Sequence, residues 1–204
     1  MMSVGTRRRS HLRLTGFDYS QAGAYLVTVC AQGRKSLFGN VVKDKIGLNK
    51  YGGMVQRRWE DLPCKYSSIK LDRFVVMPNH VHGIIIIVGA GSPRPLIPPT
   101  DLEGGETPPL QNQPSLSQII GYFKYQSAKK LNASRATPGA KIWQRSFYEH
   151  VIRDDESLNR IREYIATNPS RWHLDRENPA AHGKDDFDDW LAKFKTLPPN
   201  KLTY

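Results

Sequence analysis

The chain of 204 residues has few cysteines and no long hydrophobic run. Cys30 and Cys64 are its only cysteines, and their spacing excludes a C-x-x-C zinc cluster and argues against a disulfide scaffold. The longest apolar run, Ile84 to Val88, is far shorter than the roughly 20 residues that a membrane-spanning helix needs. No apolar stretch follows the arginines at 7–9, so the pattern of a secretory signal is missing. These absences predict a cytoplasmic protein with no membrane partner.

Acidic residues are also scarce relative to basic ones. The chain has 19 Asp and Glu against 30 Lys and Arg, which gives a formal net charge of +11 and an isoelectric point near 9.7. Such an excess favours a polyanionic partner, above all nucleic acid. Hydrophobic residues make up 39% of the chain, enough for a core, so a wholly disordered chain is excluded.

The composition divides the chain into three parts. Residues 1–19 form a basic N-terminal arm with no acid before Asp18, and residues 20–173 form one folded domain. Residues 174–204 hold five Lys and Arg against six Asp and Glu and are assigned to a C-terminal tail. Within the domain, residues 89–114 contain seven of the 14 prolines and four glycines, which predicts a flexible insert.

Periodicity within the domain predicts alternating strands and helices. Strands are expected over residues 25–30, 41–48, 69–77, 80–88 and 141–153, and helices near 52–62, over 116–131 and over 154–168. Pro169 limits the last helix at Asn168. The order of these elements predicts an α+β fold in which helices pack on an antiparallel sheet, as in ferredoxin-like folds.

The sharpest local signal is the pair His80 and His82 at the start of a predicted strand. Alternate residues of a strand share a face, so both imidazoles project together while Val81 points to the opposite layer. Two adjacent imidazoles can chelate a metal ion and leave coordination positions open for a phosphate oxygen. A pair of solvated histidines is the alternative, which the H-x-H spacing alone does not exclude.

A second pair of polar residues lies on the last predicted helix. Leu158, Ile161 and Ile165 mark its buried stripe, and at 100° per residue Tyr164 and Asn168 lie together on one flank of that stripe. Taken alone, Tyr164 fits a boundary core aromatic, and Asn168 before Pro169 fits a helix-terminating residue.

Several ordered motifs resemble the single-tyrosine HUH transposases, and among them the REP-associated tyrosine transposases of bacteria. They cover about residues 7 to 172 outside the insert. The motifs are Arg8-Arg9-Ser10, Gly16-Phe17-Asp18-Tyr19, Ala24-Tyr25-Leu26-Val27-Thr28-Val29-Cys30, Leu37-Phe38-Gly39, Val76-Met77-Pro78-Asn79-His80-Val81-His82, Trp143-Gln144-Arg145-Ser146-Phe147-Tyr148-Glu149-His150 and Glu163-Tyr164-Ile165-Ala166-Thr167-Asn168-Pro169.

The resemblance implies an HUH endonuclease architecture and a metal-dependent nuclease and strand transferase acting on single-stranded hairpin DNA. His80 and His82 would hold Mg²⁺ or Mn²⁺, and Tyr164 would be the nucleophile that forms a 5′-phosphotyrosine. Asn168 matches the family position, often glutamine, that completes the metal site. Asparagine is one methylene shorter, so it either binds the metal directly or acts through water.

Recognition of DNA is expected to combine the basic charge with base stacking. Trp143 or Tyr148 could stack an unpaired base, although a core position is the alternative for Trp143. The candidate DNA-binding residues are Arg7, Arg8, Arg9, Arg13, Lys124, Lys129, Lys130, Trp143 and Arg145.

Two other classes of function stay open on the sequence. A non-catalytic single-stranded nucleic-acid-binding module would explain the charge and the sheet. A rolling-circle initiator-like HUH nuclease would use Tyr122 and Tyr125 as paired tyrosines, although their spacing of three matches poorly the spacing of four in such enzymes. Tyr148 is the main competitor of Tyr164 as the nucleophile. A homodimer is possible for a transposase of this kind, and the sequence leaves monomer and dimer open.

Overall fold

A four-stranded antiparallel sheet forms the centre of the computed structural model, which describes residues 17–88 and 113–193. Its order is β4-β5-β1-β6, and its strands are β1 (Gly23–Cys30), β4 (Ile69–Val76), β5 (His80–Ile87) and β6 (Tyr148–Ile152). This is the strand order of a ferredoxin-like sheet and confirms the predicted α+β class. Most of the arm, most of the insert and residues 194–204 lie outside the described residues.

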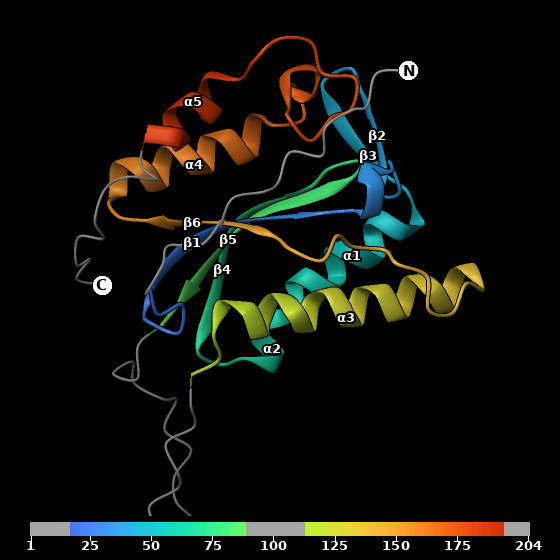
Figure 1. Ribbon diagram of the computed structural model, residues 1–204, viewed down its shortest axis with the longest axis horizontal. Coiled ribbons are helices and arrows are strands. Elements are labelled where there is room, and N and C mark those ends of the chain that lie inside the picture. The colour runs from blue at the N-terminus through green and yellow to red at the C-terminus, as the bar shows by residue number, and fades with distance from the viewer. Residues whose placement is uncertain (1–16, 89–112, 194–204) are drawn as a thin grey trace, which may run out of the picture.

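Helices cover both faces of this sheet (Figure 1). One face carries α1 (Lys50–Glu60), α2 (Leu62–Lys65) and α3 (Leu116–Arg135), and the other carries α4 (Asp155–Thr167) and α5 (Asp186–Lys193). Alternation along β1 divides its side chains between two cores: Val27 packs in the cluster of α1 and α3, and Leu26 packs in the cluster of α4 and α5. Among the described residues, no helix has the length and hydrophobicity to cross a bilayer.

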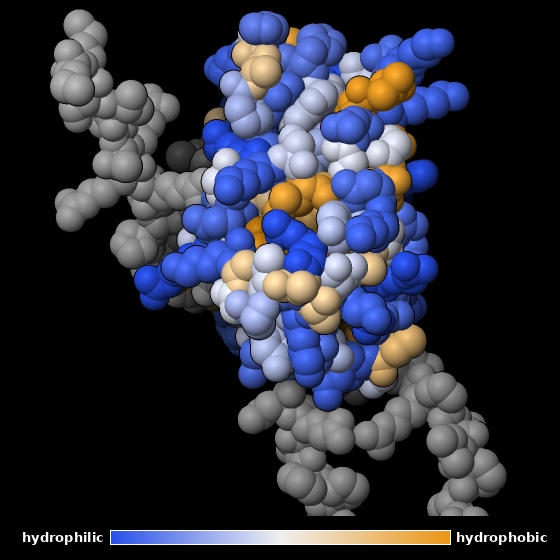
Figure 2. All heavy atoms as spheres, turned by 90° about the vertical axis from the view of Figure 1, so that its right-hand side faces the viewer, coloured by the Kyte–Doolittle hydropathy of each residue, from blue (hydrophilic) through white to orange (hydrophobic). Residues whose placement is uncertain are grey.

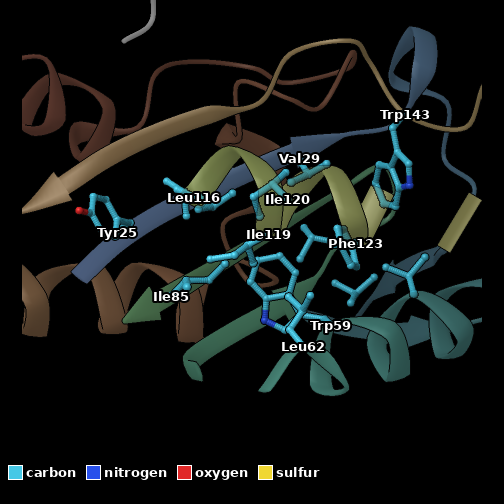
Figure 3. Close-up of a cluster of buried hydrophobic side chains, with 14 of the residues drawn as sticks. Tyr25, Val29, Trp59, Leu62, Ile85, Leu116, Ile119, Ile120, Phe123 and Trp143 are labelled. Atoms are coloured by element: carbon cyan, nitrogen blue, oxygen red, sulfur yellow. The ribbon is translucent and has the colours of Figure 1, made fainter. Parts of the chain in front are cut away.

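Aromatic rings dominate the core on the α1 and α3 side (Figure 3). The ring of Phe123 lies edge-on to Trp59 at 5.1 Å between centroids and packs against Trp143 at 5.5 Å. Gly83 of β5 faces this core, where a Cβ atom would lie 2.3 Å from Cζ2 of Trp59. The glycine therefore lets the indole pack directly beneath the strand that carries the two histidines.

Side-chain caps fix where the two longest helices begin. Ser115 and Gln118 form a reciprocal capping box at the start of α3, and Asp154 accepts a hydrogen bond from the backbone N–H of Ser157 at the start of α4. Pro169 follows Asn168, the C-cap of α4, as the sequence predicts. These contacts set the bounds of α4, and the packing of Leu158, Ile161 and Ile165 sets which face is buried.

Two predicted strands differ from the structure. The single strand predicted over 41–48 is wrong, because β2 (Gly39–Val42) and β3 (Lys45–Leu48) form a hairpin. Lys43 and Asp44 both adopt positive φ, 49° and 61°, in its two-residue turn, a conformation usually marked by Asn-Gly. The last strand, β6, begins at Tyr148 instead of 141, and before it only an isolated bridge joins Trp143 to Ala31.

Candidate active site

His80 and His82 lie side by side on the sheet face that α4 covers. Their ring centroids are 4.3 Å apart and both side chains are buried. Val81 between them packs in the opposite core. The two histidines therefore share one face, as strand alternation predicts. Their burial excludes the alternative of a solvated histidine pair.

Each imidazole is oriented through its Nδ1 atom. His80 Nδ1 lies 2.8 Å from Oδ1 of Asn79, and His82 Nδ1 lies 2.8 Å from Oγ1 of Thr28 on the neighbouring strand β1. These contacts leave both Nε2 atoms directed at a single carboxylate. Such outer contacts are what orient imidazoles in metal sites.

That carboxylate belongs to Asp175, which the sequence did not indicate as a site residue. Its Oδ2 atom lies 3.6 Å from Nε2 of His80 and 3.7 Å from Nε2 of His82, and one possible ligand atom of each of the three residues lies within 4.8 Å of the others. Asp175 follows the 3₁₀ turn η2 (Trp172–Leu174) and is buried. The segment assigned to a C-terminal tail thus supplies a third potential metal ligand.

The charges of the site are set by its burial. Burial and the neighbouring His82 lower the pKa of His80 to about 3, so its imidazole is neutral near pH 7. Burial alone would raise the pKa of Asp175, but the imidazoles and a hydrogen bond from Asn168 hold it below its usual value. A neutral imidazole therefore faces an ionised carboxylate, an arrangement that a bound cation would balance.

Tyr164 reaches the same site from α4. Its hydroxyl lies 3.2 Å from Nε2 of His82, and its ring is 6% exposed. Burial, followed by the negative charge of Asp175, raises the pKa of Tyr164 well above its usual value, so the phenol keeps its hydrogen. The sequence thus identified a tyrosine that the structure brings to the histidine pair.

Asn168 lies one helical turn after Tyr164 and is fully buried. Its Nδ2 atom donates to Oδ2 of Asp175 at 3.0 Å. Its Oδ1 atom has no hydrogen-bond partner in the described part of the chain. Because a buried acceptor without a partner is unfavourable, this oxygen is a candidate ligand for a cation.

The donor set fits a divalent cation. Nε2 of His80 is likewise buried and makes no hydrogen bond within the described residues. One possible ligand atom each of His80, His82 and Asp175 lies within 4.8 Å of the others. Oδ1 of Asn168, whose Nδ2 is bonded to Asp175, is a further candidate oxygen. Carboxylate and carbonyl oxygens suit Mg²⁺ and Mn²⁺, while the imidazoles favour Mn²⁺ over Mg²⁺.

Residues 172–193 cover this site. The ring of Phe187 stacks on Tyr164 with centroids 3.7 Å apart, and Trp172 packs near His80. Arg171 forms ion pairs with Asp185 and Asp186. Residues 174–193, the described part of the segment assigned to a tail, thus pack against α4 and the sheet and cover the site.

The candidate DNA-binding residues that the structure describes lie on α3 and in the segment that follows it, across the sheet from the histidines. Lys129, Lys130 and Arg145 are exposed, whereas Lys124 donates to the backbone carbonyls of Gln144 and Arg145. Arg7, Arg8, Arg9 and Arg13 lie outside the described residues.

Trp143, also proposed for base stacking, lies in the core. Its side chain is 7% exposed and its Nε1 atom donates to Oγ of Ser127 at 2.9 Å. This burial favours the core alternative over stacking on an unpaired base.

Two of the competing tyrosines lie across the sheet from the histidines, and the third, Tyr148, packs in the same hydrophobic cluster as Tyr164. Tyr122 and Tyr125 lie on α3, across the sheet from the histidines, and Tyr125 is 63% exposed. Tyr148 lies on β6, where the guanidinium of Arg176 sits 4.7 Å from its ring centroid. Burial raises the pKa of Tyr148 to about 12. Of these tyrosines, Tyr164 is the one whose hydroxyl contacts a site histidine.

No family model matches the chain, but individual proteins do. It is 32% identical over 174 residues to an uncharacterized protein of Haemophilus influenzae, with 85% of this chain and 95% of that protein covered. It is 25% identical over 160 residues to a Haemophilus influenzae protein that carries the name REP-associated tyrosine transposase, covering 74% of this chain and 73% of that protein.

The fold is similar to that of a REP-associated tyrosine transposase solved bound to a REP hairpin. The TM-score is 0.50 at 20% sequence identity, and the match covers 80% of this chain and 74% of the other. This likeness confirms the predicted HUH architecture.

Proposed function

Because the chain belongs to the family of REP-associated tyrosine transposases, which process DNA, we propose that it is a metal-dependent endonuclease and strand transferase for single-stranded hairpin DNA. The observation that carries the proposal is the contact between the Tyr164 hydroxyl and Nε2 of His82, 3.2 Å apart, beside Asp175. A nucleophile and a set of cation ligands thereby share one buried site.

In this proposal Tyr164 attacks the scissile phosphate. A bond forms between its oxygen and phosphorus, and the bond to the 3′ oxygen breaks, leaving a 5′-phosphotyrosine and a free 3′-hydroxyl. A second 3′-hydroxyl can reverse the step and join another strand, because the tyrosyl link keeps the phosphodiester energy. In the net reaction, the hydrogen that the Tyr164 hydroxyl loses ends on the departing 3′ oxygen, which becomes the free 3′-hydroxyl.

His80, His82, Asp175 and Asn168 would hold the divalent cation. When bound, the cation polarises the phosphate and stabilises the negative charge that develops on it. The chain's own contribution is to orient these ligands and to exclude water from the nucleophile. The division into arm, domain and tail, and a homodimer, stay predictions.

The charge distribution supports a DNA surface on the α3 side of the sheet. Residues 113–147 contain six Lys and Arg and no Asp or Glu, whereas residues 154–193 contain ten Asp and Glu and six Lys and Arg. Figure 2 faces the end of the molecule that carries the β2–β3 hairpin and the C-terminal end of α3, and this end is mostly hydrophilic with small separate hydrophobic patches. DNA held near α3 must pass the sheet edge to reach Tyr164, which suits a single strand better than a rigid duplex.

The nucleophile is tested by trapping the covalent adduct. Wild type, Tyr164→Phe and Tyr148→Phe are incubated with Mn²⁺ and single-stranded hairpin DNA, then denatured and resolved by electrophoresis. We expect adducts with wild type and Tyr148→Phe, and none with Tyr164→Phe. An adduct that persists in Tyr164→Phe would refute the assignment, and an adduct formed with chelator present would refute the metal requirement.

The DNA surface is tested by a matched pair of charge reversals. The double variant Lys129→Glu with Lys130→Glu should bind the hairpin about tenfold or more weakly. The slope of log K against log salt, which is roughly 0.7 per phosphate contact in single strands, should also become shallower. Lys43→Glu with Lys45→Glu makes the same charge change on the exposed hairpin of β2 and β3. Equal losses in the two double variants would show a non-specific charge effect and contradict the α3 surface.

A further inference from the structure

Asn79 is a fully buried residue in the turn between β4 and β5, and its side chain makes three contacts. Nδ2 donates to the carbonyl oxygen of Glu177 at 2.7 Å and to that of Arg34 at 3.1 Å. Oδ1 lies 2.8 Å from Nδ1 of His80. One amide thus joins the histidine pair to the segment that carries Asp175 and to the loop after β1.

The two carbonyls determine which way this amide faces. A carbonyl oxygen only accepts hydrogen bonds, so the atom of Asn79 facing Glu177 and Arg34 must be the NH₂ group. With both of its N–H bonds directed at these oxygens, Oδ1 is left for His80. An amide oxygen is also only an acceptor, and therefore Nδ1 of His80 must carry a hydrogen to make the 2.8 Å contact.

We infer that Asn79 is a positioning residue that fixes the His80 tautomer with hydrogen on Nδ1 and the lone pair on Nε2, so that Nε2 can bind a divalent cation. This inference rests on the proposed metal site, but the tautomer itself is a property of the metal-free chain. The Nε2 lone pair faces Oδ2 of Asp175 at 3.6 Å without a hydrogen bond. The alternative tautomer would place a hydrogen there and block the ligand atom.

Thr28, the corresponding partner of His82, provides the matched control. Its hydroxyl can either donate to or accept from Nδ1 of His82, so the 2.8 Å contact does not by itself impose a tautomer. Asn79 differs because backbone carbonyls on two other segments fix its orientation. We therefore expect loss of Asn79 to change His80, and loss of Thr28 to leave His80 unchanged.

The tautomer is read by long-range ¹H–¹⁵N NMR of the metal-free protein, with the His80 signals assigned from a His80→Gln variant. Wild type should show hydrogen on Nδ1 of His80. Asn79→Asp, whose carboxylate still accepts from Nδ1, should keep that pattern, whereas Asn79→Ala should show a mixture of tautomers. Wild-type protein with hydrogen on Nε2 would overturn the inference, even if both variants failed to fold.

Affinity for Mn²⁺ alone, measured by calorimetry without DNA, supplies the second readout. We expect Asn79→Ala to bind about 10- to 100-fold more weakly, as is typical when an outer hydrogen bond to a ligating histidine is lost. Asn79→Asp should bind more tightly than Asn79→Ala, although it loses its bonds to both carbonyls and should unfold at a lower temperature. Thr28→Val loses the outer bond to His82 and therefore serves as a control for the tautomer of His80, not for Mn²⁺ affinity. Equal loss in Asn79→Asp and Asn79→Ala would indicate a merely structural role. Mn²⁺ binding with this pattern but no DNA cleavage by wild type would reject the proposed function and leave the inference standing.

Discussion

Acid should destabilise the metal-free protein through His80 at a pH well above that at which carboxylates titrate. The pKa of this buried imidazole is about 3 in the folded chain, because of burial and the adjacent His82, against about 6.5 when it is exposed by unfolding. Between these values the unfolded chain binds a proton that the folded chain does not. The stabilising contribution is therefore complete above about pH 6.5 and is lost as the pH falls.

The size of this effect follows from the difference between the two states. Each pH unit below about 6.5 costs about 1.4 kcal/mol, so His80 should remove about 2 kcal/mol of the free energy of unfolding between pH 8 and pH 5. Asp175 has a lowered pKa, so its own contribution is lost only below the unfolded value of about 4. The range from pH 6.5 to 5 therefore isolates the histidine from this carboxylate.

Urea titrations at pH 8, 6.5 and 5 in the presence of chelator measure this loss. A His80→Gln variant keeps the other titrating groups and lacks this imidazole, so the difference between the two pH profiles reports His80 alone. Parallel profiles for the two proteins would refute the buried neutral imidazole. At pH 8, Mn²⁺ at 100 times its dissociation constant should add about 2.7 kcal/mol to the free energy of unfolding.

Three further predictions concern the surroundings of the histidines. Tyr164→Phe removes the hydroxyl that competes with a cation for Nε2 of His82. The affinity of the DNA-free protein for Mn²⁺ should therefore rise by a factor of about 2 to 12, the equivalent of one hydrogen bond, and weaker binding in calorimetry would contradict this competition. Gly83→Ala places a Cβ atom 2.3 Å from the Trp59 ring and should lower the free energy of unfolding by about 3 kcal/mol, and a loss in urea titration below about 1 kcal/mol would argue against this packing. Phe187→Ala removes the ring stacked on Tyr164 and should speed amide hydrogen exchange in α5 but not in β5, whereas unchanged exchange in α5 would show that the stack does not hold the helix.

Local patterns were sufficient to predict much of the site. Alternation along one strand places His80 and His82 on a shared face, and helical periodicity places Tyr164 and Asn168 on one flank of α4. These relations depend only on the geometry of one regular element each. The aliphatic residues of each element show which of its sides is buried in the core.

Asp175 was not predictable in this way. It lies more than 90 positions after the histidines, in a stretch without strand or helix periodicity between α4 and α5. Its position depends on a 3₁₀ turn after Pro169 and on the contact of Asn79 with the Glu177 carbonyl. The composition of residues 174–204, nearly balanced in charge, resembles a solvated tail, although the alternation of Asp175, Arg176 and Glu177 was a weak signal of paired charges.

Residues 172–193, which cover the site, are held more firmly beside Asp175 than at α5, and this difference affects how DNA would reach Tyr164. The residues beside Asp175 are tied to the sheet by buried bonds: Asn79 holds the Glu177 carbonyl, and the Glu177 carboxylate pairs with Arg34 at 3.0 Å. The start of α5 is held by ion pairs of Arg171 with Asp185 and the exposed Asp186 and by an ion pair between Arg176 and Asp188. Exposed pairs such as that of Asp186 contribute little to stability. An eight-residue helix is not stable alone, so its contacts with α4, chiefly through Phe187 and Leu191, keep it in place. Displacement of α5 that breaks the Arg176–Asp188 pair would uncover the Tyr164 ring while the bonds of Asn79 and Arg34 to Glu177 keep Asp175 beside the histidines. Access to the nucleophile then does not require loss of the ligand set.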